Sequence, residues 1–301
     1  MRKDNIRNIA IIAHVDHGKT TLVDAMLKQS GVYHEHQHIE ERVMDSMDLE
    51  KERGITITAK NTAVYYKDIK INIVDTPGHA DFGGEVERSL NMVDGALLLV
   101  DASEGPLPQT RFVVQKALEK KLPIILVINK IDRPDARPDE VIDEVYDLFI
   151  DLNANEEQIE FSIIYTNAKI GAAHKEIDDN SDSLIPLFDQ IVTSIPGPEV
   201  GDGSVTQFLI TNLDYDNYVG RLAIGRMMSG ELESNKSYAL CGEGDSVSTI
   251  KISVLYTYSG LEKTQVEKVE AGDIIAIAGE EKVQIGDTVS NLDNPVPLER
   301  I

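Results

Sequence analysis

The sequence of 301 residues predicts an α/β domain with a doubly wound, mostly parallel sheet, followed by a small antiparallel β-barrel. Two observations predict this fold class. Short apolar runs alternate with amphipathic segments over the first two-thirds of the chain, and short strands with glycine–acid turns fill the remainder. At about 150 residues per domain, the length also indicates two domains. We expect them to span residues 1–198 and 199–301.

Nearly continuous apolar runs rich in β-branched residues predict the strands of the first domain. They cover residues 8–13, 69–74, 96–100, 123–128 and 161–166. Such runs are typical of parallel strands buried on both faces. Amphipathic patterns predict helices over residues 20–29, 85–92, 108–120, 139–152 and 184–193. A sheet wound in this order binds ligands at the carboxyl ends of its strands.

A turn signal, Ile195-Pro196-Gly197-Pro198, separates the two predicted domains. Beyond it, short strands are predicted over residues 205–213, 220–227, 237–240, 247–256 and 274–278. Glycine beside an acidic residue marks the breaks, as at Gly230-Glu231 and Gly272-Asp273. This spacing is typical of a small β-barrel or a β-sandwich, and we expect the barrel.

The composition excludes several classes of protein. The fraction of hydrophobic residues, 42%, excludes wholesale disorder. A single cysteine, Cys241, excludes a disulfide framework and a cysteine-based zinc cage, and it indicates a reducing, cytoplasmic setting. The apolar runs are far shorter than the ~20 residues of a membrane span, and no apolar signal segment precedes the first strand, so we expect no membrane partner. The net charge of −23 argues against autonomous, non-specific nucleic-acid binding.

The strongest local signal is a phosphate-binding loop, AHVDHGKTT, which spans residues 13–21 between a predicted strand and a predicted helix. Backbone N–H groups and the helix N-terminus of such a loop face a polyphosphate. Gly18 permits close approach, Lys19 supplies a cation to the β- and γ-phosphates, and the Thr20 hydroxyl binds Mg²⁺. The pattern GxxxxGK[ST] has Gly where this chain has Ala13, so we expect a slightly different turn. The predicted nucleotide contacts here are Asp16, His17, Gly18, Lys19, Thr20 and Thr21.

Two further segments complete a magnesium and γ-phosphate site in this interpretation. Asp75-Thr76-Pro77-Gly78 follows a predicted strand, where the Asp75 carboxylate can hold Mg²⁺ through a water and the Gly78 N–H can contact a γ-phosphate. Thr56, in Arg53-Gly54-Ile55-Thr56, is placed by chain order to close over Mg²⁺. The predicted metal ligands are therefore Thr20, Thr56 and Asp75.

The base-binding signal is Asn129-Lys130-Ile131-Asp132 at the end of another predicted strand. A carboxylate at Asp132 can accept two hydrogen bonds from guanine N1 and N2, which adenine cannot donate. A buried carboxylate left unpaired by ATP would favour guanine by roughly 10⁴-fold. Asn129, Lys130 and Asp132 are therefore predicted to bind GTP.

These motifs resemble those of translational GTPases of the elongation factor G type, and most of all the BipA/TypA ribosome-associated GTPases. The resemblance covers the whole chain. It is carried by ERVMDSMDLEKERGITITAK, which the related LepA group shares, by INIVDTPGHADFGGEVER and by GPLPQTRF. It implies a P-loop GTPase domain followed by a translation-factor β-barrel. Members of these families continue into further domains that contact the ribosome, so the resemblance implies a fragment of a longer protein.

The resemblance also assigns roles to single residues. His79 matches the histidine that orients the attacking water, and an imidazole after glycine suits that task. Val15 and Ile55 match a hydrophobic gate that shields the water. Asp16 matches an aspartate that binds a monovalent cation. Ala168 and Lys169 stand in the second base-contacting segment, where Asn167 replaces the usual serine, so we expect altered nucleotide affinity.

The predicted function is a GTPase that binds GTP or GDP with Mg²⁺ and hydrolyses GTP to switch conformation on the ribosome. The resemblance implies a cytoplasmic monomer that acts in large-subunit assembly or in translation under stress or cold, with rRNA, ribosomal proteins and tRNA as candidate partners. The alternatives are an elongation factor G, LepA or ribosome-protection GTPase, a non-ribosomal regulatory GTPase, and a silent binding module. No arginine finger is evident, so we expect stimulation by a partner.

Two surface features leave their roles open. Arg221 and Arg226 are predicted either as rRNA contacts of the barrel or as ordinary surface residues. Residues 1–134 carry a net charge of −2, residues 135–199 carry −13, and residues 201–301 carry −8. We therefore expect the acidic stretch to face away from rRNA, toward solvent or a basic protein.

Overall fold

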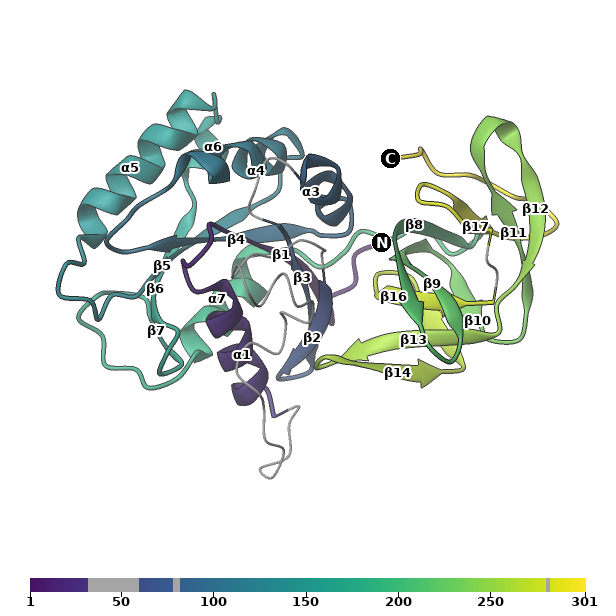
Figure 1. Ribbon diagram of the computed structural model, residues 1–301, viewed down its shortest axis with the longest axis horizontal. Coiled ribbons are helices and arrows are strands. Elements are labelled where there is room, and N and C mark those ends of the chain that lie inside the picture. The colour runs from purple at the N-terminus through teal and green to yellow at the C-terminus, as the bar shows by residue number, and fades with distance from the viewer. Residues whose placement is uncertain (32–59, 78–81, 280–281) are drawn as a thin grey trace. The chain divides into compact units, whose positions relative to one another are not determined.

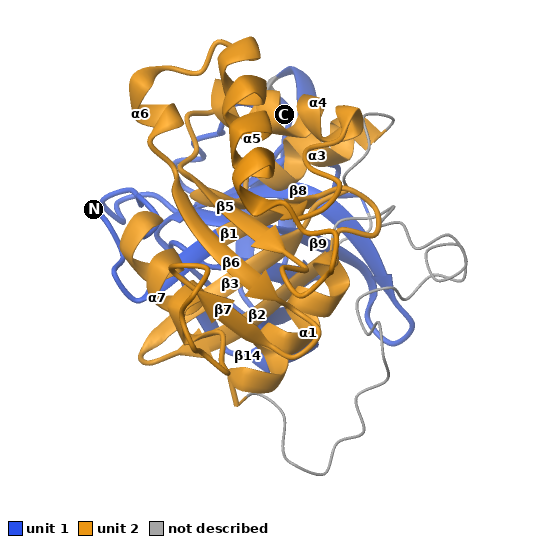
Figure 2. Cartoon of the chain, turned by 90° about the vertical axis from the view of Figure 1, so that its left-hand side faces the viewer, with its two compact units in different colours: residues 1–8, 197–301 blue, residues 9–196 orange. Residues whose placement is uncertain are grey.

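The computed structural model describes residues 1–31, 60–77, 82–279 and 282–301. The chain divides into two compact units (Figure 2): unit 2 comprises residues 9–196, and unit 1 comprises residues 1–8 with residues 197–301. Within these ranges no helix has the length and apolar character that crossing a bilayer requires.

The described part of unit 2 contains a seven-stranded sheet in the order β2-β3-β1-β4-β5-β6-β7. β1, β4, β5 and β6 are parallel, whereas β2 pairs antiparallel with β3, and β7 with β6. The strands are β1 (Ile6–Ala13), β2 (Lys60–Tyr66), β3 (Ile69–Asp75), β4 (Gly95–Asp101), β5 (Ile124–Asn129), β6 (Ser162–Asn167) and β7 (Ala172–His174). The order reverses at β1, so the carboxyl end of β1 lies at the topological switch point where such sheets bind ligands.

Helices cover both faces of this sheet, as a doubly wound fold requires (Figure 1). α1 (Lys19–Gln29) and α7 (Ile185–Ser194) lie on one face. α3 (Gly83–Leu90), α4 (Pro108–Glu119), α5 (Pro138–Asp151) and α6 (Glu156–Ile159) lie on the other. Proline stands in the first turn of α4, α5 and α7, where its missing N–H costs no hydrogen bond. The predicted α/β class is confirmed.

β2 and β7 were not predicted. Both pair antiparallel and lie at the edges of the sheet. Their sequences, KNTAVYY and AAH, lack the continuous run of β-branched apolar residues that the predicted strands share.

Unit 1 is an antiparallel β domain. Its described residues form an eight-stranded sheet in the order β12-β11-β17-β8-β9-β16-β13-β14, and a separate pair β10-β15. The strands are β8 (Gln207–Asp216), β9 (Gly220–Ser229), β10 (Glu231–Glu233), β11 (Ser237–Cys241), β12 (Val247–Lys251), β13 (Val254–Ser259), β14 (Glu262–Val266), β15 (Lys268–Glu270), β16 (Ile274–Ala278) and β17 (Thr288–Ser290).

One apolar core lies inside the larger sheet of unit 1. It combines Ile250 of the edge strand β12 with Phe208 of β8 and Leu255 of β13, and Val266 of the opposite edge strand β14 packs against it. Because residues near both edges share one core, the sheet curls around it, as the predicted barrel requires.

Three expectations for the second domain differ from the structure. The strand predicted over residues 247–256 is two strands: β12 pairs with β11, β13 pairs with β16, and Ile252 and Ser253 between them belong to neither strand. Residues 1–8, which include the first three residues of β1, group with unit 1, and the Met1 amino group and the Lys3 N–H donate to the carbonyls of Val200 and Pro198. Arg226 is only 5% exposed and is therefore not a surface residue, whereas Arg221 is exposed.

Candidate functional site

The phosphate loop joins the buried strand β1 to α1. Ala13 is the last residue of β1, is buried and pairs in register with Leu99 of β4, so alanine at this position extends the strand. Gly18 caps α1 with a φ of +95°, a backbone conformation that favours glycine. A Cβ on Gly18 would lie 2.4 Å from Asn129 Nδ2. The loop therefore requires glycine for both its backbone angle and its close packing.

Lys19 connects the loop to the carboxyl end of β3. Its Nζ lies 2.6 Å from Asp75 Oδ1 and donates to the Thr76 carbonyl at 3.0 Å. The Asp75 side chain is 2% exposed, so its charge is held in a nearly buried setting beside the lysine. The structure thus brings together the two motifs that the sequence analysis assigned to phosphate and Mg²⁺.

Asn129, the last residue of β5, connects three segments. Its Nδ2 donates to the His17 carbonyl at 2.8 Å, which fixes the phosphate loop. Its Oδ1 accepts from Thr166 Oγ1 at 3.0 Å and from the Ala168 N–H at 3.1 Å. Asn129 is 1% exposed, and satisfied hydrogen bonds at such a buried amide define one arrangement. The segment that starts with Thr166 therefore has a fixed place beside the phosphate loop despite the unusual Asn167.

Lys130 reaches back over the phosphate loop. Its Nζ donates to the Asp16 carbonyl at 2.5 Å and lies 2.8 Å from Asp101 Oδ2. Asp101 is fully buried at the end of β4, and its Oδ1 accepts from the N–H and hydroxyl of Ser103. Burial by itself would raise the pKa of Asp101, but the bonds from Lys130 and Ser103 outweigh it and lower the pKa from 3.8 to about 2.

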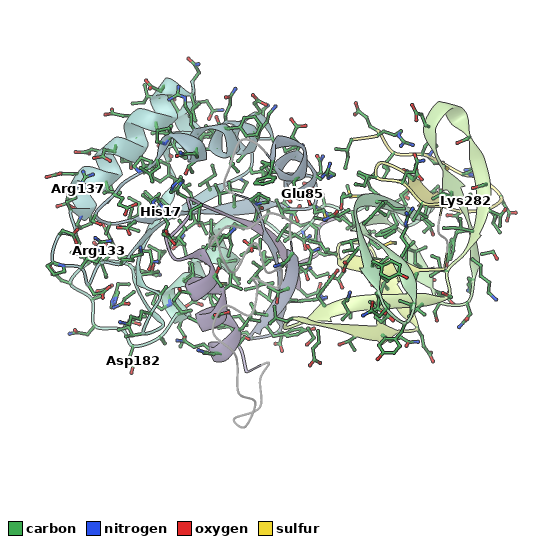
Figure 3. The ribbon with its side chains drawn as sticks, viewed as in Figure 1. His17, Glu85, Arg133, Arg137, Asp182 and Lys282 are labelled. Atoms are coloured by element: carbon green, nitrogen blue, oxygen red, sulfur yellow. The ribbon has the colours of Figure 1, made fainter. Side chains whose placement is uncertain are left out.

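His17 lies between the phosphate loop and the end of β4. Its Nδ1 lies 3.4 Å from both the Leu99 carbonyl oxygen and the Asp101 nitrogen, and its Nε2 lies 3.4 Å from Glu104 Oε2. The ring is 1% exposed. Burial, and next the neighbouring His14, lower the pKa of His17 below 6.5, against the opposing influence of Leu99, Asp101 and Glu104. Figure 3 labels His17 and Arg133, which lie at the same end of unit 2.

The remaining predicted residues divide into three groups. Asp16, Thr21, Asp132 and Lys169 are exposed. Thr20 and Val15 are partly buried in the phosphate loop. Thr56, Ile55, Gly78 and His79 lie outside the described residues. The carboxylate of Asp132, expected to be buried, is thus open to solvent in this structure.

Sequence reasoning missed Asp101 and Thr166 at this site. Both lie at or near the carboxyl end of a parallel strand, and Asp101 is the direct β-sheet neighbour of Asn129. The available signal was a polar residue ending an otherwise apolar strand, the same signal that identified Asp75. It was not used for Asp101, because no recognised motif surrounds this residue.

The residues present suit a nucleotide with Mg²⁺. In the parts of the chain that the structure describes, no group of three or more His, Cys, Asp or Glu forms a metal cage. However, Thr20 and Asp75 supply hydroxyl and carboxylate oxygens, which Mg²⁺ prefers, and Mg²⁺ at such sites keeps several waters and uses only one or two carboxylates beside the substrate phosphates. The buried Asp75 carboxylate already pairs with a cation, the Lys19 ammonium, so its position suits a positively charged ligand.

Family models match both units of the chain. The model described as "Elongation factor Tu GTP binding domain" matches residues 4–197, and that described as "Elongation factor Tu domain 2" matches residues 220–290. The chain belongs to this family of GTP-binding proteins. Its first domain is therefore a GTP-binding domain, in agreement with the predicted phosphate loop.

Several relatives belong to the BipA/TypA group that the motifs indicated. The large ribosomal subunit assembly factor BipA of Bacillus subtilis is 49% identical over 99% of this chain and 49% of its own length. An elongation factor TypA-like chloroplastic protein of Arabidopsis thaliana is 51% identical over the full chain and 44% of its own length. The resemblance to BipA/TypA proteins is confirmed. The chain spans about half the length of these relatives.

A solved structure supports the two-domain fold. A crystal structure of a protein from Thermus thermophilus superposes with a TM-score of 0.73 at 20% identity, covering 99% of this chain and 56% of that one. At this identity the likeness concerns the fold alone.

Proposed function

We propose that this chain is the nucleotide-binding part of a ribosome-associated GTPase. It binds GTP and GDP with Mg²⁺, and hydrolysis of GTP changes its conformation on the ribosome. The observation that carries the proposal is the junction at Asn129, where one buried amide holds the phosphate loop through His17 and the following loop through Ala168. This junction makes phosphate binding and base binding parts of one site.

The phosphates occupy the loop before α1 in this proposal. Gly18 allows the backbone to approach them, Lys19 provides the neutralising cation, and the helix N-terminus favours their negative charge. Lys19 then exchanges Asp75 for phosphate oxygens, which frees the Asp75 carboxylate for the metal. Thr20 and Thr56, with Asp75 acting through a water, would hold Mg²⁺, which would neutralise phosphate charge.

The guanine base lies over the ends of β5 and β6. Asp132 accepts hydrogen bonds from the base, and its exposure leaves the carboxylate accessible to a ligand. The Ala168 N–H, which donates to Asn129 Oδ1 here, shares that proton with guanine O6. The stems of Lys130 and Lys169 flank the base, and Asp16 and Thr21 contact the phosphate side.

Hydrolysis depends on residues of the segments Arg53–Thr56 and Asp75–His79, together with Val15 of the phosphate loop. His79 orients the attacking water, the Gly78 N–H senses the γ-phosphate, and Val15 with Ile55 shields the water until a partner rearranges the site. Asp16, whose carboxylate is exposed, holds a monovalent cation. Turnover is slow without a partner, because the chain offers no arginine finger in its motifs.

The names of the relatives support assembly of the large ribosomal subunit as the role, ahead of the elongation factor G and LepA alternatives. Action under stress or cold, rRNA and ribosomal proteins as direct contacts, tRNA as a further partner, a monomeric state and a cytoplasmic location complete the proposal. A non-ribosomal regulatory GTPase is the second class, and the antiparallel β domain in residues 197–301 disfavours it.

The nucleotide assignment is tested by titrating the chain with GDP and with ADP in the presence of Mg²⁺. We expect GDP to bind at least about 1,000-fold more tightly, because ADP leaves the Asp132 carboxylate without its two donors. Comparable affinities would contradict the guanine assignment. Repeating the GDP titration in K⁺ and in Cs⁺ salts tests the cation at Asp16.

The ribosomal role is tested with the full-length protein. It should sediment with ribosomes in the presence of a non-hydrolysable GTP analogue and remain in the supernatant with GDP. Ribosomes should also accelerate GTP hydrolysis by at least about 1,000-fold if a partner completes the site. Ribosome binding that does not depend on the nucleotide, or GTP hydrolysis that ribosomes do not accelerate, would favour another class of GTPase.

A further inference from the structure

The end of β4 carries a buried carboxylate that none of the nucleotide motifs includes. Asp101 closes β4, is 0% exposed and pairs in register with Asn129 of the neighbouring strand β5. Its two oxygens face different groups. Oδ1 accepts from the N–H and hydroxyl of Ser103 at 2.8 and 2.7 Å, and Oδ2 faces Lys130 at 2.8 Å and Arg133 at 3.5 Å.

Lys130 links the Asp101 carboxylate to the phosphate loop. A lysine ammonium carries three donors on a flexible stem, so one contact would leave its position loosely defined. Here Nζ contacts two fixed groups in different segments, the Asp16 carbonyl at 2.5 Å and Asp101 Oδ2 at 2.8 Å. The ammonium is thereby held between β4 and the backbone of the phosphate loop.

A second contact joins the same two segments. The Asp101 nitrogen and the Leu99 carbonyl oxygen both lie 3.4 Å from His17 Nδ1, and the carbonyl of His17 accepts from Asn129. The end of β4 therefore braces both Asp16 and His17. These are the residues immediately before the glycine and lysine that face the phosphates.

Stability alone does not account for a charge at this place. Replacing a buried ion pair by apolar groups of similar size is often neutral or stabilising, because desolvation offsets the attraction. A buried carboxylate that binds Lys130, which itself binds the Asp16 carbonyl, instead fixes the position of the loop after β5 relative to the phosphate loop. We propose that Asp101 is a positioning residue of the nucleotide site, which fixes Lys130 against the phosphate loop and so slows the release of bound guanine nucleotide.

This inference rests on the proposed nucleotide-binding function, and its test separates the two. The variants are Asp101→Asn, Lys130→Met and the double variant, compared with the unchanged chain for dissociation of a fluorescent GDP analogue. Asp287→Asn serves as the matched control, because Asp287 is a buried, arginine-paired aspartate in unit 1. If the unchanged chain failed to prefer GDP over ADP, the proposed function itself would fail, whatever the variants did.

We expect Asp101→Asn to release GDP about tenfold faster, because the Lys130 ammonium loses its charged acceptor at the end of β4. Lys130→Met should have at least this effect, and the double variant should be no worse than Lys130→Met, since Asp101 acts through Lys130. Asp287→Asn should lower the melting temperature while GDP release stays within twofold. A purely structural role for Asp101 would lower the melting temperature and leave GDP release unchanged.

Two outcomes would overturn the proposal: GDP release within twofold of the unchanged chain for Asp101→Asn, or effects of the two single variants that multiply in the double variant. If Asp101→Asn does not fold, Ser103→Ala provides the milder test. It removes one donor to Asp101 Oδ1 and should release GDP about threefold faster. An unchanged rate for that variant would also contradict the proposal.

Discussion

The two units each bury an ion-paired aspartate, and they use it differently. In unit 1, Asp287 accepts from the Gln284 N–H and pairs with Arg300 at 2.8 Å. It therefore stabilises the turn from Gln284 to Asp287 and binds Arg300 beside it. In unit 2, Asp101 contacts Lys130, which in turn contacts Asp16. Burial and charge alone therefore do not indicate a function. What distinguishes the two carboxylates is whether their partners belong to loops that we propose to bind a nucleotide.

The first prediction concerns Asn129, the β-sheet neighbour of Asp101 in unit 2. Asn129→Ala should weaken GDP binding by about 100-fold, because it leaves the His17 carbonyl, the Thr166 hydroxyl and the Ala168 N–H without their partner. Isothermal titration calorimetry measures the affinity. An affinity within tenfold of the unchanged chain would show that the junction does not organise the site.

The second prediction concerns the packing at Gly18. Gly18→Ala should weaken GDP binding by roughly 10- to 100-fold, because its Cβ would lie 2.4 Å from Asn129 Nδ2 and the φ of +95° strains any other residue. Gly31→Ala is the matched control, since Gly31 also has a positive φ of +69° but has nothing within 4 Å of the added Cβ. Equal losses in both variants would assign the effect to backbone strain alone.

The third prediction tests the other side of the comparison. Asp287→Asn should lower the free energy of unfolding of unit 1 by about 1–3 kcal/mol, because Arg300 and the Gln284 N–H lose a charged acceptor. Urea unfolding of the whole chain, followed by tyrosine fluorescence, measures it. A change in GDP affinity beyond twofold would remove the distinction between the two aspartates.

The fourth prediction concerns a single hydroxyl in unit 2. Thr166→Val keeps the shape of the side chain but removes the donor to Asn129 Oδ1, so GDP affinity should fall by about fivefold. The corresponding control in unit 1 is Thr211→Val, which removes a buried hydroxyl that donates to the Ile224 carbonyl. Thr211→Val should lower the free energy of unfolding and leave GDP affinity unchanged. Titration of both variants with GDP measures the affinities.

The smallest effect is expected from the pH dependence of His17. Its pKa is lowered below 6.5 in the folded chain by burial and by His14, so the unfolded chain binds the extra proton more readily. The free energy of unfolding should therefore fall as the pH drops through 6.5, and level off below the folded pKa. Urea unfolding of the chain and of His17→Gln between pH 7.5 and 5 tests this. The variant should show a weaker pH dependence, and an unchanged slope would contradict the lowered pKa.

Much of the proposed nucleotide site follows from local sequence. Gly18, Lys19 and Thr20 stand together in a nine-residue loop, and Asp75 and Asn129 each end an apolar strand, so strand ends and motifs were enough to find them. Asp101 and Thr166 were not predicted. Asp101 is a single polar residue at the end of a strand, and Thr166 stands next to the Asn167-Ala168-Lys169 segment without a predicted role. The parallel pairing of β4, β5 and β6 brings both residues beside Asn129.

The barrel shows the same division. Its strands over residues 205–229 were predictable from apolar runs and turn glycines, whereas short strands such as Glu231–Glu233 and Lys268–Glu270 carry almost no local signal. The burial of Arg226 was equally invisible, because alternation along a strand assigns a face but not what covers it.

The sequence by itself determined the α/β class, the order of the two domains, the phosphate loop and the guanine-type motif, because each depends on residues close together in the chain. The tertiary structure decided which polar side chains share the carboxyl edge of the sheet. It placed the Asp101 carboxylate on Lys130, and Lys130 on the Asp16 carbonyl, across segments up to 114 residues apart. The physical reason is that register between parallel strands is set by packing of the whole core, and only that register brings these charges within hydrogen-bonding distance.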